Sequence, residues 1–303
     1  MAIGISPTID FAFKVLFGSP EHARITIHFL NAILRPLVRI AQITIQNPFL
    51  GKDDENDKLS VLDILAIDDH GRILNIEMQT TLPAGLSKRL AYYTASLYSG
   101  QLSEGGLYTS LRPAISICVL TQPIFPDSNE LHLEFQLRTT SGLNLTDDLQ
   151  IQLLQLSKLN VELRHMAEAN FTEQWAYFML HADRMSEDDV KRVFEDPVFS
   201  EAAGVLEMIS RTPDQQLKYD ARVKFQRDEE ARFELARSEG LREGLREGME
   251  KGMEKGALLG RISLLQELLG GLGQSMTELK ELDQPQLVAI EETLQLQLRT
   301  RGR

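Results

Sequence analysis

The feature that most constrains the fold is a pair of β-type apolar runs at residues 59–67 and 73–79. The segment between them, residues 68–71, is Asp-Asp-His-Gly, which suits the tight turn of a β-hairpin. Two more strands are expected, at about residues 40–46 and in the apolar run 114–120. The chain is therefore predicted to contain a sheet that includes a local hairpin.

Helices are predicted before and after these strands. Ser-Pro pairs at residues 6–7 and 19–20 each place a capping hydroxyl before a proline at the first helical position. The second helix should end near Arg35, because Pro36 disfavours helix in the residue before it. Apolar residues at helical spacing return over about residues 85–102.

The predicted order through residue 120 is α-α-β-β-β-α-β, which indicates an α/β fold. A further strand is expected at about residues 130–137, and from about Thr172 the sequence changes to long helical patterns rich in Glu, Arg and Lys. We therefore expect an α/β domain over residues 1–165 and a helical region over residues 166–303.

One internal repeat lies in the predicted helical region. Between Gly240 and Gly260, glycine recurs every fourth residue, and an apolar row recurs at the same interval, formed by Leu241, Leu245, Met249 and Met253. Each glycine costs about 1 kcal/mol inside a helix, so the repeat needs a packing reason such as the close approach of another helix. We expect a homo-oligomer formed through these helices, although a solvated linker helix remains an open alternative.

Charge and cysteine content limit the class of protein. A formal net charge of −12 argues against a protein that coats nucleic acid by bulk electrostatics. It remains compatible with carboxylates that gather a divalent cation and so meet a phosphate substrate. The single cysteine, Cys118, cannot form an intramolecular disulfide, and the sequence shows neither a signal peptide nor a membrane-spanning apolar stretch. These features predict a cytoplasmic protein.

The residues that suggest chemistry lie in the predicted hairpin. Glu77 and Gln79 are two residues apart, so they share one face of their strand. Asp63 lies among apolar residues, where an ionised carboxylate is costly to bury without a partner. If the two strands pair, Asp63 can reach the face of Glu77, and two converging carboxylates suit a hard cation such as Mg²⁺. The alternative for Glu77 and Gln79 is the solvated face of an ordinary antiparallel strand.

Several motifs, taken in order and spacing, resemble a known family. It comprises the recombination-promoting nucleases, also labelled transposases, within the PD-(D/E)XK nuclease superfamily. The resemblance covers about residues 5–125. It rests on Thr8-Ile9-Asp10-Phe11-Ala12-Phe13-Lys14, Phe29-Leu30-Asn31-Ala32-Ile33-Leu34, the Asp63 strand, Ile76-Glu77-Met78-Gln79, and Arg89 followed by Tyr92 and Tyr93.

The resemblance implies a restriction-endonuclease-like αβββαβ core with a mixed sheet, and divalent-metal-dependent cleavage of double-stranded DNA. Asp63 and Glu77 match the metal-binding acids, with Mg²⁺, or Mn²⁺ or Ca²⁺, as the expected ion. Gln79 stands where the wider superfamily usually has lysine, and it completes the expected catalytic set. We expect it to orient the attacking water or to contact a phosphate oxygen.

Three further residues receive roles from the resemblance. Asp10 matches an acidic position that assists the metal, and Lys14 and Arg89 are expected to contact phosphate. Ordinary structural explanations also exist: Asp10 lies near a helix start, where the macrodipole stabilises a carboxylate, and Arg89 can belong to a solvated helix face.

The alternative function is a catalytically weak nuclease fold that acts as a DNA-binding or protein-assembly module. The acidic charge and the glutamine at position 79 both favour it. RNA also remains open as the substrate, because a metal site for phosphodiesters does not itself distinguish the sugars.

Overall fold

The computed structural model describes residues 1–37, 39–46, 63–271 and 273–301 of the chain. The described chain forms two compact units, Met1–Asp228 and Glu229–Arg303. The polar segment 47–57 and the first residues of the strand predicted at 59–67 lie outside the described residues.

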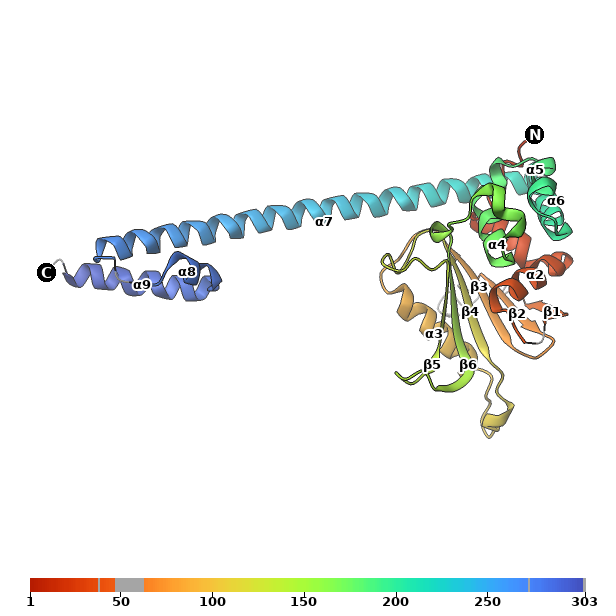
Figure 1. Cartoon of the computed structure of the whole chain (residues 1–303), viewed down its shortest axis with the longest axis horizontal. Helices are drawn as coiled ribbons and strands as arrows, with labels where there is room; N and C mark the ends of the chain where they lie inside the picture. Colours follow the sequence, from red (N-terminus) through yellow and green to blue (C-terminus); the bar gives the residue numbers. More distant parts are fainter. Residues whose placement is uncertain (38, 47–62, 272, 302–303) are drawn as a thin grey trace. The chain divides into compact units, whose positions relative to one another are not determined.

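The first unit is built on a mixed six-stranded sheet with the order β1-β2-β3-β4-β6-β5 (Figure 1). β1, β2 and β3 are antiparallel neighbours, β3, β4 and β6 run parallel, and β5 returns antiparallel to β6. The strands are β1 (Ile43–Gln46), β2 (Ile64–Asp68), β3 (Ile73–Gln79), β4 (Ala114–Leu120), β5 (His132–Arg138) and β6 (Asn144–Gln155).

The predicted hairpin is present as β2 and β3. Asp68 closes its turn, because its carboxylate accepts hydrogen bonds from the backbone N–H groups of His70 and Arg72 at 3.0 and 2.9 Å. Gly71 adopts a φ of 78°, which glycine accepts without a steric cost. The local sequence therefore determines this turn.

Helices surround the sheet in the order that the sequence predicts. The α-helices of this unit are α1 (Asp10–Gly18), α2 (Ala23–Leu34), α3 (Leu86–Ser99), α4 (Phe171–His181), α5 (Glu187–Val193) and α6 (Pro197–Arg211). Short 3-10 helices are η1 (Pro20–His22), η3 (Tyr108–Ser110), η4 (Leu156–Lys158), η5 (Leu163–Glu168) and η6 (Ala182–Arg184).

The first two helices begin later than their Ser-Pro pairs suggest. The Ser6 hydroxyl accepts a hydrogen bond from the Thr8 N–H at 3.3 Å, so it caps a turn, and α1 starts at Asp10. Pro20 opens the 3-10 turn η1 before α2. The predicted end of the second helix is confirmed, because Arg35 leaves the helical conformation with a φ of 44°.

The two faces of the sheet are covered by different helices. α3 lies on one side, where Leu86 and Leu90 pack against Cys118 of β4 and Leu153 of β6. α2 and α4 lie on the other side (Figure 1). The large core there is rich in aromatic rings, including Phe13, Phe17, Phe29, Trp175, Phe178 and Phe199.

Strand β6 was not predicted from the sequence. Its N-terminal half is largely exposed, and Gln150, Gln152 and Gln155 give its other half a polar appearance. Gln152 and Gln155 are nevertheless buried. β6 also inserts between β4 and β5, and this placement depends on pairing between distant segments.

The first unit is longer than the α/β domain of residues 1–165 expected from the sequence. α4, α6 and the beginning of helix α7 (Pro213–Leu268) share its core, and Tyr219 of α7 is only 7% exposed. The unit therefore continues to Asp228.

The second unit contains the rest of α7 together with α8 (Met276–Glu281) and α9 (Gln284–Arg301). Its apolar core consists mainly of leucines, and Arg261 pairs with Glu291 at 2.7 Å. The predicted helical C-terminal region is thus confirmed. Within the described residues, no helix is long and apolar enough to cross a membrane.

Candidate metal-binding active site

Asp63 and Glu77 meet where β2 begins and β3 ends. Ile64 of β2 lies opposite Ile76 of β3, so Asp63, one residue before β2, lies beside the Glu77 end of β3. The Asp63 Oδ2 atom accepts a hydrogen bond from the Met78 N–H at 3.0 Å. The hairpin therefore brings together the two acids that the sequence singled out.

The Glu77 side chain is only 3% exposed and lies on the sheet face that α3 covers. The Asn75 Nδ2 atom donates to Glu77 Oε1 at 2.9 Å, and Arg89 Nη2 of α3 lies 3.7 Å from Oε2. Burial raises the pKa of Glu77, and repulsion from Asp63 adds to the rise. The contacts with Asn75 and Arg89 offset part of this effect.

Asp63 is also largely removed from water. Burial raises the pKa of its carboxyl above the usual value, Lys14 opposes this rise, and Asp10 adds to it. Neighbouring buried carboxyls whose pKa values are raised are often found at functional sites. Such a pair favours the binding of a cation that compensates both charges.

Lys14 of α1 stands between two carboxylates. Its Nζ atom lies 2.9 Å from Asp10 Oδ1, one helical turn earlier, and 3.1 Å from Asp63 Oδ1. Burial lowers the pKa of Lys14, but the two acids outweigh that effect and raise it overall. Lys14 therefore remains a charged ammonium group, able to contact an anion but not to act as a base near neutral pH.

Asp10 has a second cationic neighbour that the sequence did not reveal. Arg222 Nε of α7 lies 3.7 Å from Asp10 Oδ2. No local pattern could have identified Arg222, because only tertiary folding brings α7 next to α1.

The polar face of β3 has three members. Glu77 and Gln79 share this face as predicted, and hydrogen bonding from the Gln79 side chain lowers the pKa of Glu77. Asn75 is the member that the sequence analysis missed. Its spacing of two residues from Glu77 was the available signal, because alternate residues of a strand share a face.

Comparison with known families gives one match. A family model described as PD-(D/E)XK nuclease family transposase matches residues 7–236. The chain belongs to the PD-(D/E)XK nuclease family transposases. The matched region contains Asp10, Lys14, Asp63, Glu77 and Arg222. No curated protein and no solved structure matched the sequence.

The donor set of this PD-(D/E)XK protein suits a hard divalent cation. Among the residues that the structure describes, no three His, Cys, Asp or Glu side chains cluster closely enough to hold a metal ion. Mg²⁺ needs fewer protein ligands, because it usually binds one or two carboxylates and completes its shell with water and phosphate. Asn75 Nδ2 donates to Glu77, and the buried Asn75 Oδ1 atom has no hydrogen-bond partner in the described part of the chain.

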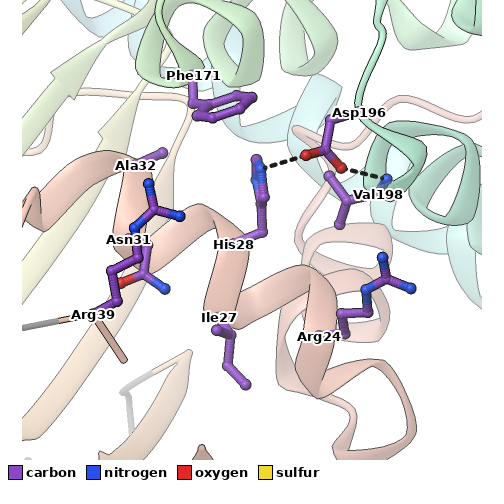
Figure 2. Close-up of a pocket in the computed structure, with 9 residues that line it drawn as sticks. All are labelled: Arg24, Ile27, His28, Asn31, Ala32, Arg39, Phe171, Asp196 and Val198. Atoms are coloured by element: carbon purple, nitrogen blue, oxygen red, sulfur yellow. Dashed lines mark hydrogen bonds and ion pairs between the residues drawn. The ribbon is translucent and has the colours of Figure 1, made fainter. Parts of the chain in front are cut away.

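A separate pocket of about 220 Å³ lies along α2 and is centred on His28 (Figure 2). His28 Nδ1 accepts a hydrogen bond from Trp175 Nε1 at 2.9 Å, and Nε2 lies 3.5 Å from Asp196 Oδ2. Burial lowers the pKa of His28. Both ring nitrogens are thus engaged in joining α2 to α4 and to the start of α6. None of the family's candidate site residues lines this pocket.

Proposed function

We propose that this PD-(D/E)XK protein is a divalent-metal-dependent deoxyribonuclease that hydrolyses phosphodiester bonds in double-stranded DNA. The observation that carries the proposal is the meeting of Asp63 and Glu77, two desolvated carboxylates with raised pKa values, at the β2–β3 hairpin. Asp63, Glu77 and the Met78 carbonyl would hold Mg²⁺, with Mn²⁺ or Ca²⁺ as substitutes, and Asp10 assists this site.

The bound ion would polarise the phosphodiester and supply hydroxide near neutral pH. Gln79 has no basic group, so its amide orients the attacking water or donates to a phosphate oxygen. Lys14 and Arg89 each lie beside one of the acids, and both would contact the substrate phosphate. The family description also supports a role in DNA recombination or mobile elements.

We also propose that the chain forms a homo-oligomer through α7. Leu241, Leu245, Met249 and Met253 are each more than 60% exposed along the glycine repeat. A contiguous exposed apolar row is typical of an interaction surface. We further propose that the protein acts in the reducing cytoplasm, which is consistent with Cys118 being a buried free thiol.

Cleavage of supercoiled plasmid tests the catalytic proposal directly. Purified protein with Mg²⁺ or Mn²⁺ should nick the plasmid, and EDTA should stop the reaction. Asp63→Asn and Glu77→Gln should each lower the rate on the order of 100-fold or more, a cost typical of losing one preorganised electrostatic contact. Glu134→Gln, which changes an exposed acid on β5 of the same sheet, should leave the rate unchanged.

Cleavage that both site variants retain would contradict the proposed site. A folded wild-type protein that cleaves nothing would favour the alternative function, a catalytically weak fold that serves as a DNA-binding or assembly module. A matched RNA duplex, tested in parallel, separates deoxyribonuclease from ribonuclease activity.

A further inference from the structure

The first turns of α7 are packed firmly against the N-terminal segment. Tyr219 is 7% exposed within the main core, and Val223 packs against that core one turn later. The Tyr219 hydroxyl accepts a hydrogen bond from the Ser6 N–H at 2.9 Å. These contacts determine the position of Arg222, which lies between the two anchored residues.

Arg222 and Lys14 use different oxygens of the same carboxylate. Asp10 Oδ1 lies 2.9 Å from Lys14 Nζ, and Asp10 Oδ2 lies 3.7 Å from Arg222 Nε. A carboxylate with a cation at each oxygen has a defined orientation. Arg222 therefore favours the orientation in which Oδ1 points at Lys14.

Lys14 is in turn shared between Asp10 and Asp63. Its Nζ atom is 3.1 Å from Asp63 Oδ1, so the ammonium group competes with a divalent cation for that oxygen. A strong contact with Asp10 gives Lys14 another partner, which weakens this competition. The availability of Asp63 thus depends on how well Asp10 holds Lys14.

We propose that Arg222 is a positioning residue for the metal site: by orienting Asp10 toward Lys14, it leaves Asp63 available to a divalent cation. The inference rests on the proposed metal-dependent nuclease function. Arg222 lies within the region that the family model matches, residues 7–236. This role of Arg222 also gives Asp10 an indirect way to assist the metal.

The test measures Mn²⁺ affinity of the full-length protein, from the electron paramagnetic resonance signal of free Mn²⁺, without DNA. Arg222→Gln should weaken Mn²⁺ binding about two- to fivefold, as expected for a partly exposed ion pair. Arg222→Lys should restore most of the affinity. Lys224→Gln removes the same charge from an exposed position two residues along α7 and is the matched control. Long-range electrostatics alone predicts the opposite change, a stronger binding of Mn²⁺ by Arg222→Gln, because removing a positive charge reduces the repulsion of the cation.

Arg222→Gln in a Lys14→Gln background tests whether the effect of Arg222 acts through Lys14. Without Lys14 there is no competitor at Asp63, so Arg222→Gln should no longer change the Mn²⁺ affinity. Equal weakening in both backgrounds, or an effect no larger than that of Lys224→Gln, would overturn the proposal. If the wild-type protein neither binds Mn²⁺ nor nicks plasmid, the proposed function itself fails. Mn²⁺ binding without coupling between Arg222 and Lys14 refutes only the present inference.

Discussion

Glu77 is a carboxylate whose surroundings oppose its negative charge. Burial is the largest cause, and the neighbouring Asp63 adds repulsion. A site that binds a cation is expected to be destabilising without its ligand, because its charges are held together in a poorly solvated place. We therefore expect the Glu77 carboxylate to lower the stability of the metal-free protein while it serves metal binding.

We expect Glu77→Gln to raise the thermal stability of the metal-free protein at pH 7. The pKa of Glu77 is raised above 4.5 in the folded state, so the native protein retains this proton more strongly than the unfolded chain does. The free energy of unfolding therefore falls as pH rises from 4.5 through the raised pKa. The gain in thermal stability from Glu77→Gln should be present at pH values above the raised pKa of Glu77 and absent below pH 4.5.

Thermal melts in EDTA, recorded between pH 4 and pH 8, check this expectation. Each kcal/mol gained in the free energy of unfolding should raise Tm by about 2–4 °C for a domain of this size. Glu134→Gln is the control, because Glu134 is exposed on the same sheet. A lower Tm for Glu77→Gln at pH 7 would show that the contacts with Asn75 and Arg89 outweigh the burial of charge.

At the scale of elements, local periodicity identified most helices and strands of the first unit. The strand predicted at 114–120 has the same bounds in the structure, and the strand at 73–79 does too. Side-chain period and turn residues are local properties, so they survive into the fold. β6 was missed because its polar alternation becomes a buried strand only between β4 and β5.

The repeated glycines lower the stability of helix α7, and no close contact within the described part of the chain accounts for them. A Cβ atom added at Gly244, Gly248 or Gly252 would meet nothing within 4 Å. The exposed helix is supported instead by ion pairs such as Arg246 with Glu250 at 2.8 Å. Such pairs contribute only a few tenths of a kcal/mol each.

At protein concentrations low enough to keep the chain monomeric, we expect Gly248→Ala to stabilise α7 by about 1 kcal/mol, because alanine restricts the unfolded chain and fits the helix without contact. Circular dichroism melts of the full chain provide the measurement. Gly271→Ala is the contrasting variant, since Gly271 has a φ of 77° that alanine tolerates poorly. Destabilisation of the monomeric chain by Gly248→Ala would contradict this expectation, whereas destabilisation seen only at concentrations where the oligomer forms would support a partner helix at this glycine.

At the scale of the whole molecule, the structure describes two compact units along one chain. The first contains the candidate site, and the second contains the glycine repeat of α7. Cleavage and self-association are therefore expected to respond to different substitutions.

We expect the wild-type protein to sediment as an oligomer, and Gly244→Leu with Gly248→Leu to shift it toward the monomer. Leucine is a good helix former, so loss of mass would report a blocked helix contact rather than an unfolded α7. Analytical ultracentrifugation over a range of concentrations gives the result. Ser238→Leu, just before the repeat, is the control, and a monomeric wild type would contradict the expectation.

The sequence by itself determined the kinds of elements, the β2–β3 hairpin and the shared face of Glu77 and Gln79, because these depend on neighbours along the chain. It also indicated Asp63, through the improbability of an isolated carboxylate among apolar residues. Only the tertiary structure decided the place of β6 and the contacts of Lys14 with Asp63, Arg89 with Glu77 and Arg222 with Asp10. Each of these joins separate elements, and such pairing depends on packing of the whole unit rather than on any local pattern.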